Sequence, residues 1–311
     1  MGLRHWRYKG LLQAVLSRLP GGGWVNDRLQ LWVGGLRNFE DNVRRKVGDW
    51  VGLMRYLRSA GCEGVAGWRI LEIGTGWYPT LPVCFALAGA GPILTVDLNR
   101  HVKEALTFRM LRALGAHLDA IAPFAASGAG ELRKAYERLL VLRELAALWS
   151  ACQIEYRAPQ DAARLEFVEP ASFDMVYSNS VLEHVRPEAI PLLMKESWRV
   201  LKPGGLMVHA VACNDHYAHF DRSISFLNYL QYTEKQWRRW NNRLNYQNRL
   251  RAPDFLRYAR EAGFRIVHEA RAVRPGSREA LAKLRLAPEF RHYSWEDLVA
   301  TSVDFVARKQ P

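Results

Sequence analysis

Cysteine is scarce in this chain of 311 residues, which contains four. They stand far apart and never form a CxxC pair, at Cys62, Cys84, Cys152 and Cys213. We therefore expect neither a disulfide framework nor a zinc knuckle built on paired cysteines. The pattern is typical of a reduced, cytoplasmic protein.

Long apolar runs are also absent. The most apolar stretch, residues 81–98, is interrupted by Pro82, Gly89, Gly91 and Pro92, so we expect a helix, a turn and a strand there rather than a membrane span. The N-terminus lacks an uninterrupted hydrophobic segment followed by a small-residue cleavage site, so we expect no secretory signal. The length fits one elaborated domain or two small ones.

Acidic residues are in deficit. The chain has 31 of them against 44 basic residues, for a net charge of +13. Such a surplus fits nucleic acid, an anionic membrane surface or a phosphorylated acceptor. It also fits a chain of arginine-rich composition with no charged partner, so charge alone does not decide the function.

The first 60 residues carry 11 of the basic residues and 4 acidic ones. Residues 1–20 read as a basic amphipathic helix that ends at Pro20, and residues 24–59 as one or two helices with apolar side chains every three or four positions. We expect residues 1–60 to form a helical cap on a main domain of residues 61–311. A lid or a membrane-surface anchor is the alternative.

From residue 68 onward, strands and helices alternate. This order predicts an α/β fold with a doubly wound parallel sheet. Strands are expected at 69–73, 92–99, 153–157, 173–179, 206–213, 264–273 and 303–309. Helices are expected at 80–89, 101–115, 130–149 and 188–200, and KPGG at 202–205 is expected to turn the chain into the fifth strand.

Two helical insertions are expected in this domain, at about 116–150 and 214–260. Within the second, residues 237–251 hold five arginines and no carboxylate, interleaved with Trp237, Trp240 and Tyr246. Two interpretations stay open. The segment is either a surface that stacks rings and grips phosphates, or an amphipathic helix whose aromatic side chains face the core.

A glycine-rich turn, Gly74-Thr75-Gly76, follows the first strand directly. Glycines at this place let the backbone approach a ligand. Asp97, at the end of the second strand, comes 21 positions after Gly76, and both belong to the carboxyl edge of the sheet, where ligands bind. A carboxylate there suits the ribose of NAD, of a flavin nucleotide or of S-adenosylmethionine; capping of the next helix is the alternative for Asp97.

Five segments in order resemble the class I S-adenosylmethionine-dependent methyltransferases. They are EIGTG (72–76), VDLN (96–99), QDAARL (160–165), FDMVYSNSVLEHV (173–185) and LKPGG (201–205). The resemblance covers about residues 65–213 and implies a seven-stranded Rossmann-like methyltransferase sheet, its last strand antiparallel, with S-adenosylmethionine as cofactor. An NAD-dependent dehydrogenase would more often have glycine where this chain has Pro79.

The resemblance also assigns roles at the glycine turn. Gly74 and Gly76 would pack against the methionine portion of the cofactor, Thr75 belongs to the same binding turn, and Glu72 would support the loop. The family often has a third glycine where this chain has Tyr78, so the turn is expected to be reshaped.

Further roles follow for the rest of the sheet edge. Asp97 would hold the ribose hydroxyls, with Leu98 beside the adenine. Asp161 would accept from the adenine amino group, Ala162 would add a backbone contact, and Asn179 would lie near the sulfonium and the acceptor.

Methyl transfer is an in-line displacement that needs alignment and, for weakly acidic acceptors, a base. His184, after Glu183, is our candidate for the general base, and a helix-capping role is the alternative. His209, Asp215 and His216 are candidates to assist it.

Some relatives hold a divalent metal through an E-x-x-E-H stretch. Here Ser180 occupies the position of the first ligand, so we expect no metal site. Glu183 and His184 with a later histidine stay open as an alternative set.

The sequence thus predicts a methyltransferase that acts on a small-molecule, glycan or lipid-linked acceptor, in the cytoplasm or at the periphery of a membrane. Methylation of RNA is the alternative, as is a non-catalytic cofactor-binding protein. The acceptor and the oligomeric state stay open.

Overall fold

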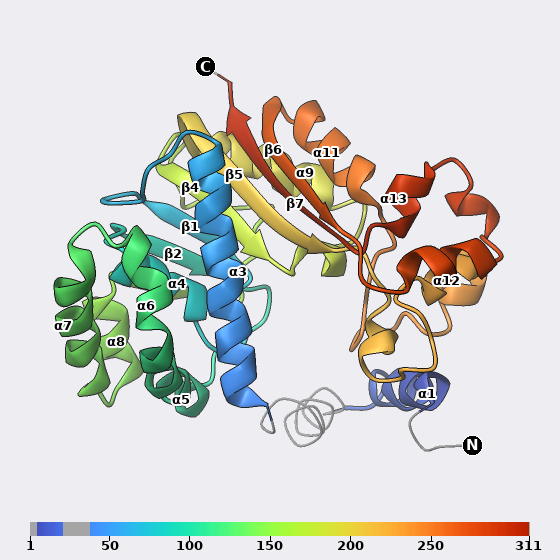
Figure 1. The fold of residues 1–311 in the computed structure, drawn as a ribbon, viewed down its shortest axis with the longest axis horizontal. Helices are drawn as coiled ribbons and strands as arrows, with labels where there is room; N and C mark the ends of the chain where they lie inside the picture. Colours follow the sequence, from blue (N-terminus) through green and yellow to red (C-terminus); the bar gives the residue numbers. More distant parts are fainter. Residues whose placement is uncertain (1–4, 21–37, 311) are drawn as a thin grey trace.

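The protein was analysed as a computed structural model that describes residues 5–20 and 38–310. Its centre is a seven-stranded sheet in the order β3-β2-β1-β4-β5-β7-β6 (Figure 1). β7 is antiparallel to both of its neighbours, and the other pairs are parallel. The strands are β1 (Ile70–Ile73), β2 (Ile93–Val96), β3 (Ile154–Arg157), β4 (Phe173–Asn179), β5 (Leu201–Ala212), β6 (Phe264–Ala272) and β7 (Ser302–Lys309). The predicted doubly wound sheet with a final antiparallel strand is confirmed.

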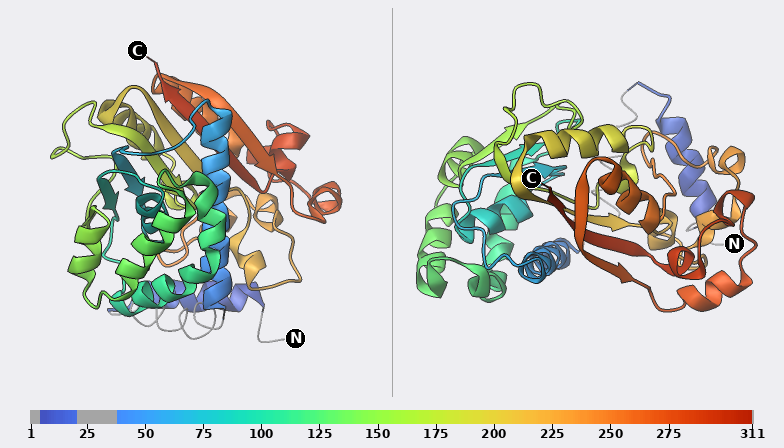
Figure 2. Two further views of the ribbon diagram at one scale, coloured as in Figure 1. Left: turned by 60° about the vertical axis from the view of Figure 1, so that its left-hand side comes forward. Right: turned by 90° about the horizontal axis from the view of Figure 1, so that it is seen from above.

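Helices cover both faces of this sheet (Figure 2). One face shares a core with α3 (Phe39–Ser59), α4 (Thr80–Leu87), α5 (Glu104–Leu114), α6 (Leu118–Ile121), α7 (Gly128–Leu140) and α8 (Leu145–Ala151). The other face packs against α9 (Ile190–Val200) and α11 (Ala252–Glu261). The insertion expected at 214–260 therefore ends in a helix, α11, that belongs to the covering layer of the sheet.

The long helix α3 buries an apolar stripe against the main domain. Val43, Val47, Trp50, Met54 and Leu57 lie in the same core cluster as the sheet. This spacing of three and four residues places them on one helical face. The cap therefore has no core of its own here; residues 21–37, where part of this helix was predicted, lie outside the described residues. No helix in the described ranges is both long and apolar enough to cross a membrane.

Two local predictions were wrong. The helix expected at 130–149 is broken into α7 and α8, because the Arg143 guanidinium donates to the carbonyl oxygens of Leu140 and Leu142 (2.8 and 3.0 Å) and so closes the end of α7. KPGG does not precede the fifth strand but lies inside β5, where the pairing with β4 shifts register and Gly204 has φ +76°.

A third core lies beside the sheet and joins three segments distant in sequence. They are α1 (Trp6–Leu16), the chain after β5 including α10 (Glu234–Trp237), and the segment between β6 and β7 with α12 (Ser277–Lys283) and α13 (Trp295–Val299). Figure 1 shows them together on the right of the molecule.

Residues 237–251 do not form the amphipathic helix considered above, since α10 ends at Trp237. The Trp237 ring is buried in the third core and is not available for stacking on a ligand. Arg251 is fully buried, and its guanidinium donates to the carbonyl oxygens of Asp297, Leu298 and Ala300. A cation placed there satisfies the free carbonyls at the end of α13. Part of the basic character of this segment is therefore structural.

Glu72 is buried at the end of β1 and connects three strands. Its carboxylate accepts hydrogen bonds from the Thr95 hydroxyl on β2 (2.6 Å) and the Tyr177 hydroxyl on β4 (2.8 Å). Burial raises the pKa of this carboxyl to about 7, although the two hydroxyls and the nearby Lys46 charge lower it.

This buried carboxyl predicts a pH dependence of stability. Its folded pKa of about 7 exceeds the ordinary 4.5, so the folded chain binds more protons between these values and the free energy of unfolding falls as pH rises through that range. Glu72→Gln removes the titration. Urea unfolding should show that wild type loses free energy of unfolding relative to Glu72→Gln as the pH rises from about 5 to about 8.

The matched control is Glu155→Gln, which removes a carboxylate exposed on β3. If the free energies of unfolding of Glu72→Gln and wild type differ by the same amount at about pH 5 and about pH 8, the raised pKa of Glu72 is contradicted.

Candidate functional site

Two glycines form the turn at the carboxyl end of β1, and the structure gives them different surroundings. Both have positive φ, +84° at Gly74 and +73° at Gly76, a conformation that favours glycine. A Cβ on Gly74 would lie 2.5 Å from the Val181 side chain, whereas one on Gly76 would meet no atom within 4 Å. Gly74 therefore permits close packing of two loops, and Gly76 leaves space for a ligand.

Thr75, between the glycines, faces inward. Its side chain is buried, and its hydroxyl contacts that of Thr95, which donates to Glu72. The hydrogen bonds that link Thr75, Thr95 and Glu72 thus fix the glycine turn to the buried strands, and the side chain of Thr75 is not exposed to a ligand.

Asp97 follows β2 and lies beside the glycine turn. Its carboxylate accepts from the Tyr156 hydroxyl (3.2 Å), and the backbone N–H of Gly76 is near enough to lower its pKa. Burial outweighs these contacts and raises the pKa of Asp97. Next to it, the Leu98 side chain is 67% exposed at the sheet edge. The buried carboxylate of Asp97, a hydrogen-bond acceptor, is therefore adjacent to the exposed apolar side chain of Leu98.

The loop after β3 is joined to Asp97 by a backbone hydrogen bond from Gln160 N–H to the Asp97 carbonyl oxygen (2.8 Å). Asp161 follows, and one of its carboxylate oxygens accepts from the Ala163 N–H (2.9 Å). Its side chain is exposed, whereas Ala162 is half-buried. The structure thus brings Asp161 and Ala162 to the same edge as Asp97.

Asn179 ends β4, and its amide donates to the Asp49 carboxylate of α3 (3.1 Å). One turn earlier on α3, the Lys46 ammonium lies 4.7 Å from the centre of the Tyr78 ring. Its charge acts on both Glu72 and Asp97. Sequence reasoning missed Lys46 and Asp49; their spacing of three positions puts them on one helical face, but no motif marks them.

Tyr78, which departs from the family pattern, has a packing role. It is buried, and its ring lies 5.1 Å from that of Phe39 at the start of α3. The reshaped turn therefore serves as the contact between the glycine turn and α3.

Past β4, a short helix η4 (Leu182–His184) carries the candidate base. His184 Nδ1 lies 2.7 Å from the carbonyl oxygen of Tyr246. Because a carbonyl only accepts, Nδ1 carries the proton and the Nε2 lone pair is free. Burial lowers the pKa of His184, which favours this neutral form.

Of the three candidate assistants, the structure brings one to His184. His216, in η5 (His216–His219) after β5, has its ring 5.0 Å from that of His184. His209 is fully buried with Nδ1 bonded to the Ser178 hydroxyl (2.7 Å), and Asp215 is a buried acceptor for Asn228 and Tyr217. These hydrogen bonds indicate that His209 and Asp215 have structural roles.

Glu183, beside the candidate base, is 1% exposed. Among the described residues, neither carboxylate oxygen has a hydrogen-bond partner. Burial raises the pKa of this carboxyl to about 8, although the N–H groups of Glu183 and Ala212 lie near enough to lower it.

Positive charge gathers beyond the histidines. Burial lowers the pKa of His219, and the charges of Arg274, Arg45 and Lys9, which come from three segments, lower it further. Arg222 and Phe226 line a hollow with His219 at the same place. The part of the site around His219 is therefore cationic.

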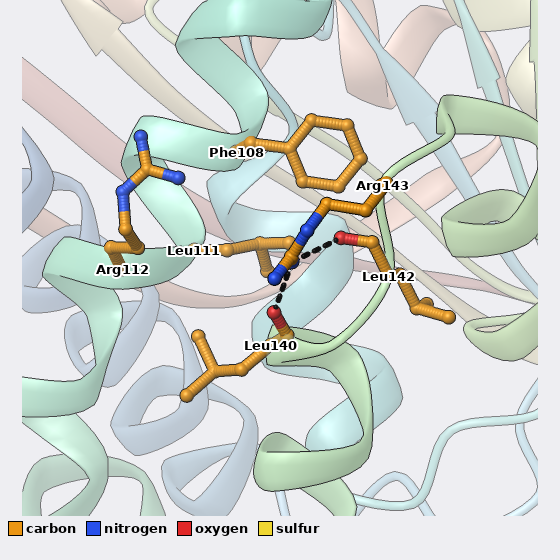
Figure 3. A pocket seen from close by; sticks show the side chains of 6 residues that line it. All are labelled: Phe108, Leu111, Arg112, Leu140, Leu142 and Arg143. Carbon is orange, nitrogen blue, oxygen red and sulfur yellow. Dashed lines mark hydrogen bonds between the residues drawn. The ribbon is translucent and has the colours of Figure 1, made fainter.

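A second hollow lies away from this edge, between α5 and the turn after α7 (Figure 3). Phe108, Leu111 and Leu140 contribute to its lining, and Arg143 there is bonded to backbone carbonyls. None of the candidate site residues lines it. We therefore place the functional site at the carboxyl edge of the sheet.

Comparison with known proteins adds the family. A family described as a methyltransferase domain matches residues 27–269. No curated protein matches the chain. Among solved structures, it is similar to an S-adenosylmethionine dependent methyltransferase from Mesorhizobium loti (19% identity, TM-score 0.44, 81% of this chain and 95% of that one covered). It is also similar to SAM-dependent methyltransferases from Methanosarcina mazei (15% identity, TM-score 0.40, 78% and 92% covered).

The family match spans most of the chain and includes the glycine turn, Asp97, Asn179 and His184. The predicted cofactor, S-adenosylmethionine, and the predicted reaction, methyl transfer, are thereby confirmed. The chain belongs to the class I S-adenosylmethionine-dependent methyltransferases.

Proposed function

We propose that this methyltransferase acts on an anionic acceptor, a phosphate- or carboxylate-bearing small molecule, glycan or lipid-linked molecule. The observation that carries the proposal is the position of two cations beside His219. The Arg274 guanidinium lies 4.4 Å from the centre of the Phe226 ring, which packs 5.1 Å from His219. The Lys9 ammonium lies 5.0 Å from the centre of the Phe220 ring. Such cations favour an anion by long-range attraction and by direct pairing. The arginines expected to serve this purpose, Arg238 and Arg239, are exposed on another part of the insertion, and Arg243 donates to the Ser17 carbonyl oxygen.

The cofactor contacts belong to the same proposal. Asp97 accepts from the ribose hydroxyls, Leu98 covers the adenine, and Asp161 accepts from the adenine amino group with its second oxygen. Gly76 gives the methionine portion room at the turn, and Asn179 stands near the sulfonium. Their common location at one edge supports these roles.

His184 is the base in this proposal. Its free Nε2 takes the proton from the acceptor as the acceptor atom attacks the methyl carbon and the carbon–sulfur bond breaks, which leaves S-adenosylhomocysteine. The lowered pKa keeps the imidazole neutral and able to accept.

The ribose assignment predicts a loss of cofactor affinity in Asp97→Asn. Replacing a charged acceptor that holds two hydroxyls should weaken S-adenosylhomocysteine binding by about 10- to 100-fold, because a hydrogen bond to a charged group contributes about 1.5–3 kcal/mol. Isothermal titration calorimetry measures the affinity of each variant for S-adenosylhomocysteine. Asp174→Asn, at the opposite end of β4 and bonded to Lys202, is the control; equal affinity in both variants would refute the role of Asp97.

The acceptor class is tested by labelling. The enzyme is incubated with methyl-labelled S-adenosylmethionine and a cell extract, and we expect the label in a product retained by an anion exchanger and resistant to ribonuclease. Arg274→Gln should raise the KM for that acceptor while leaving cofactor affinity unchanged. A neutral labelled product would overturn the proposal, and release of the label by ribonuclease would favour the RNA alternative, whose binding should weaken steeply with salt.

A membrane surface is the proposed location of this acceptor. The inner face of α1 packs in the third core through Trp6, while its outer face is apolar. The exposed side chains, each between 50% and 55% accessible, are Tyr8, Leu11, Leu12 and Val15 on α1 and Leu19 in the turn after it. Arg7 and Arg18 border this stripe, and residues 1–20 contain no acidic residue. An apolar stripe with basic flanks suits an anionic bilayer.

Vesicle sedimentation tests this location. Wild type should sediment with vesicles that contain phosphatidylglycerol and much less with phosphatidylcholine alone. The double variant Leu11→Asp, Leu12→Asp should bind at least about tenfold more weakly, because each leucine loses apolar burial. Leu192→Asp, which changes a leucine 53% exposed on α9, is the control. If the double variant instead dissociates an oligomer and never affects vesicle binding, the stripe is a contact between copies.

A further inference from the structure

We propose that Glu183, His184 and His216 form a binding site for one divalent transition-metal cation, of the Zn²⁺, Mn²⁺ or Fe²⁺ kind. Each residue offers one ligand atom, and the three atoms lie within 4.8 Å of one another. They come from η4 and η5, which follow the carboxyl ends of β4 and β5. The site therefore lies beside Asn179, where the methyl group is transferred in the proposed function.

Glu183 provides the strongest argument. Its carboxylate is 1% exposed, and within the described chain both oxygens lack a hydrogen-bond partner. A carboxyl buried without partners either stays protonated or, when it is ionised, needs a paired charge or a coordinated metal. No cationic side chain of the described residues forms an ion pair with it. A bound cation would supply the missing partner.

His184 is already held as a metal-ligating histidine is held. Its Nδ1–H donates to the Tyr246 carbonyl oxygen (2.7 Å), and this leaves Nε2 to face a ligand. A backbone carbonyl on the second ring nitrogen is the usual outer partner of such a histidine, since it fixes both tautomer and ring orientation. His216 stands with its ring 5.0 Å away and is half-buried.

The donor set matches known metal preferences. Two imidazoles and one carboxylate bind Zn²⁺ in catalytic sites and Fe²⁺ in facial sites, with at least one position left open. Metal bonds of about 2.0–2.2 Å require the three ligand atoms to be somewhat closer than they are here. Rotation of the half-buried His216 side chain supplies that movement, while His184 keeps the ring orientation set by Tyr246.

This geometry differs from the expectation drawn from the sequence. Ser180 indeed occupies the place of a first acidic ligand, but His216 completes a set of three from the next strand end. With a metal bound, His184 Nε2 is a ligand and does not act as the base. The ion would then replace that base: it would hold an acceptor hydroxyl and lower its pKa, so that the proton passes to water before the acceptor oxygen attacks the methyl carbon. This role rests on the proposed function, whereas binding of the ion does not.

The test is a titration of tag-free, chelator-treated protein with Co²⁺, followed by calorimetry and by the visible absorption of the bound ion. We expect one ion per chain, and an affinity at least about tenfold weaker in His216→Ala and in Glu183→Gln. His219→Ala, which removes the neighbouring imidazole outside the set of three, is the matched control and should bind as wild type does.

Absence of stoichiometric binding, or equal binding by wild type and His216→Ala, would overturn the proposal. Thermal unfolding and S-adenosylhomocysteine binding without metal show that each variant is folded. If Co²⁺ binds as expected and the labelled product is neutral, the metal site stands and the proposed acceptor class falls.

Discussion

The burial of one carboxylate, Glu72, governs the arrangement of the carboxyl edge. In the sheet it stands directly between Thr95 of β2 and Tyr177 of β4, which are its cross-strand partners in register and also its hydrogen-bond donors. A slip of either strand by one residue would turn these hydroxyls away and leave the carboxylate among apolar side chains. The same group holds Thr75 through Thr95, so strand register and the shape of the glycine turn depend on a single network.

Local patterns were sufficient to predict the sheet, the cofactor and the common edge where the proposed cofactor-binding residues lie. Short apolar runs marked all seven strands, and the distance from Gly76 to Asp97 placed both at one edge, because parallel strands end together. The break between α7 and α8 was missed, since the apolar stripe continues through it and Arg143, an ordinary surface residue in the sequence, ends the helix. Periodicity records which face is apolar and does not record where a side chain closes a helix.

On the proposed acceptor side, sequence reasoning named His184 and His216 but could not show their contacts, because this side is assembled from distant segments. Lys46 and Asp49 arrive on α3, and His216 meets Glu183 and His184 only because β4 and β5 are neighbours. The two interpretations of the arginine-rich segment could not be separated from the sequence for a related reason. Its composition is that of a binding surface, yet Arg249 and Arg251 are buried and bind backbone carbonyls of other segments. The sequence shows charge, and only the fold shows which charges are already satisfied.

The third core makes the acceptor side a joint product of three stretches of chain. Arg251 ties the insertion to α13, and Trp6 of α1 packs on Tyr217 with ring centroids 5.3 Å apart. None of these stretches has a core of its own, so each depends on the other two for its packing. In the proposed function, a change of acceptor therefore requires matched substitutions in α1, in the insertion and between β6 and β7. The cofactor side, built on one continuous run of strands and helices, is free of that constraint.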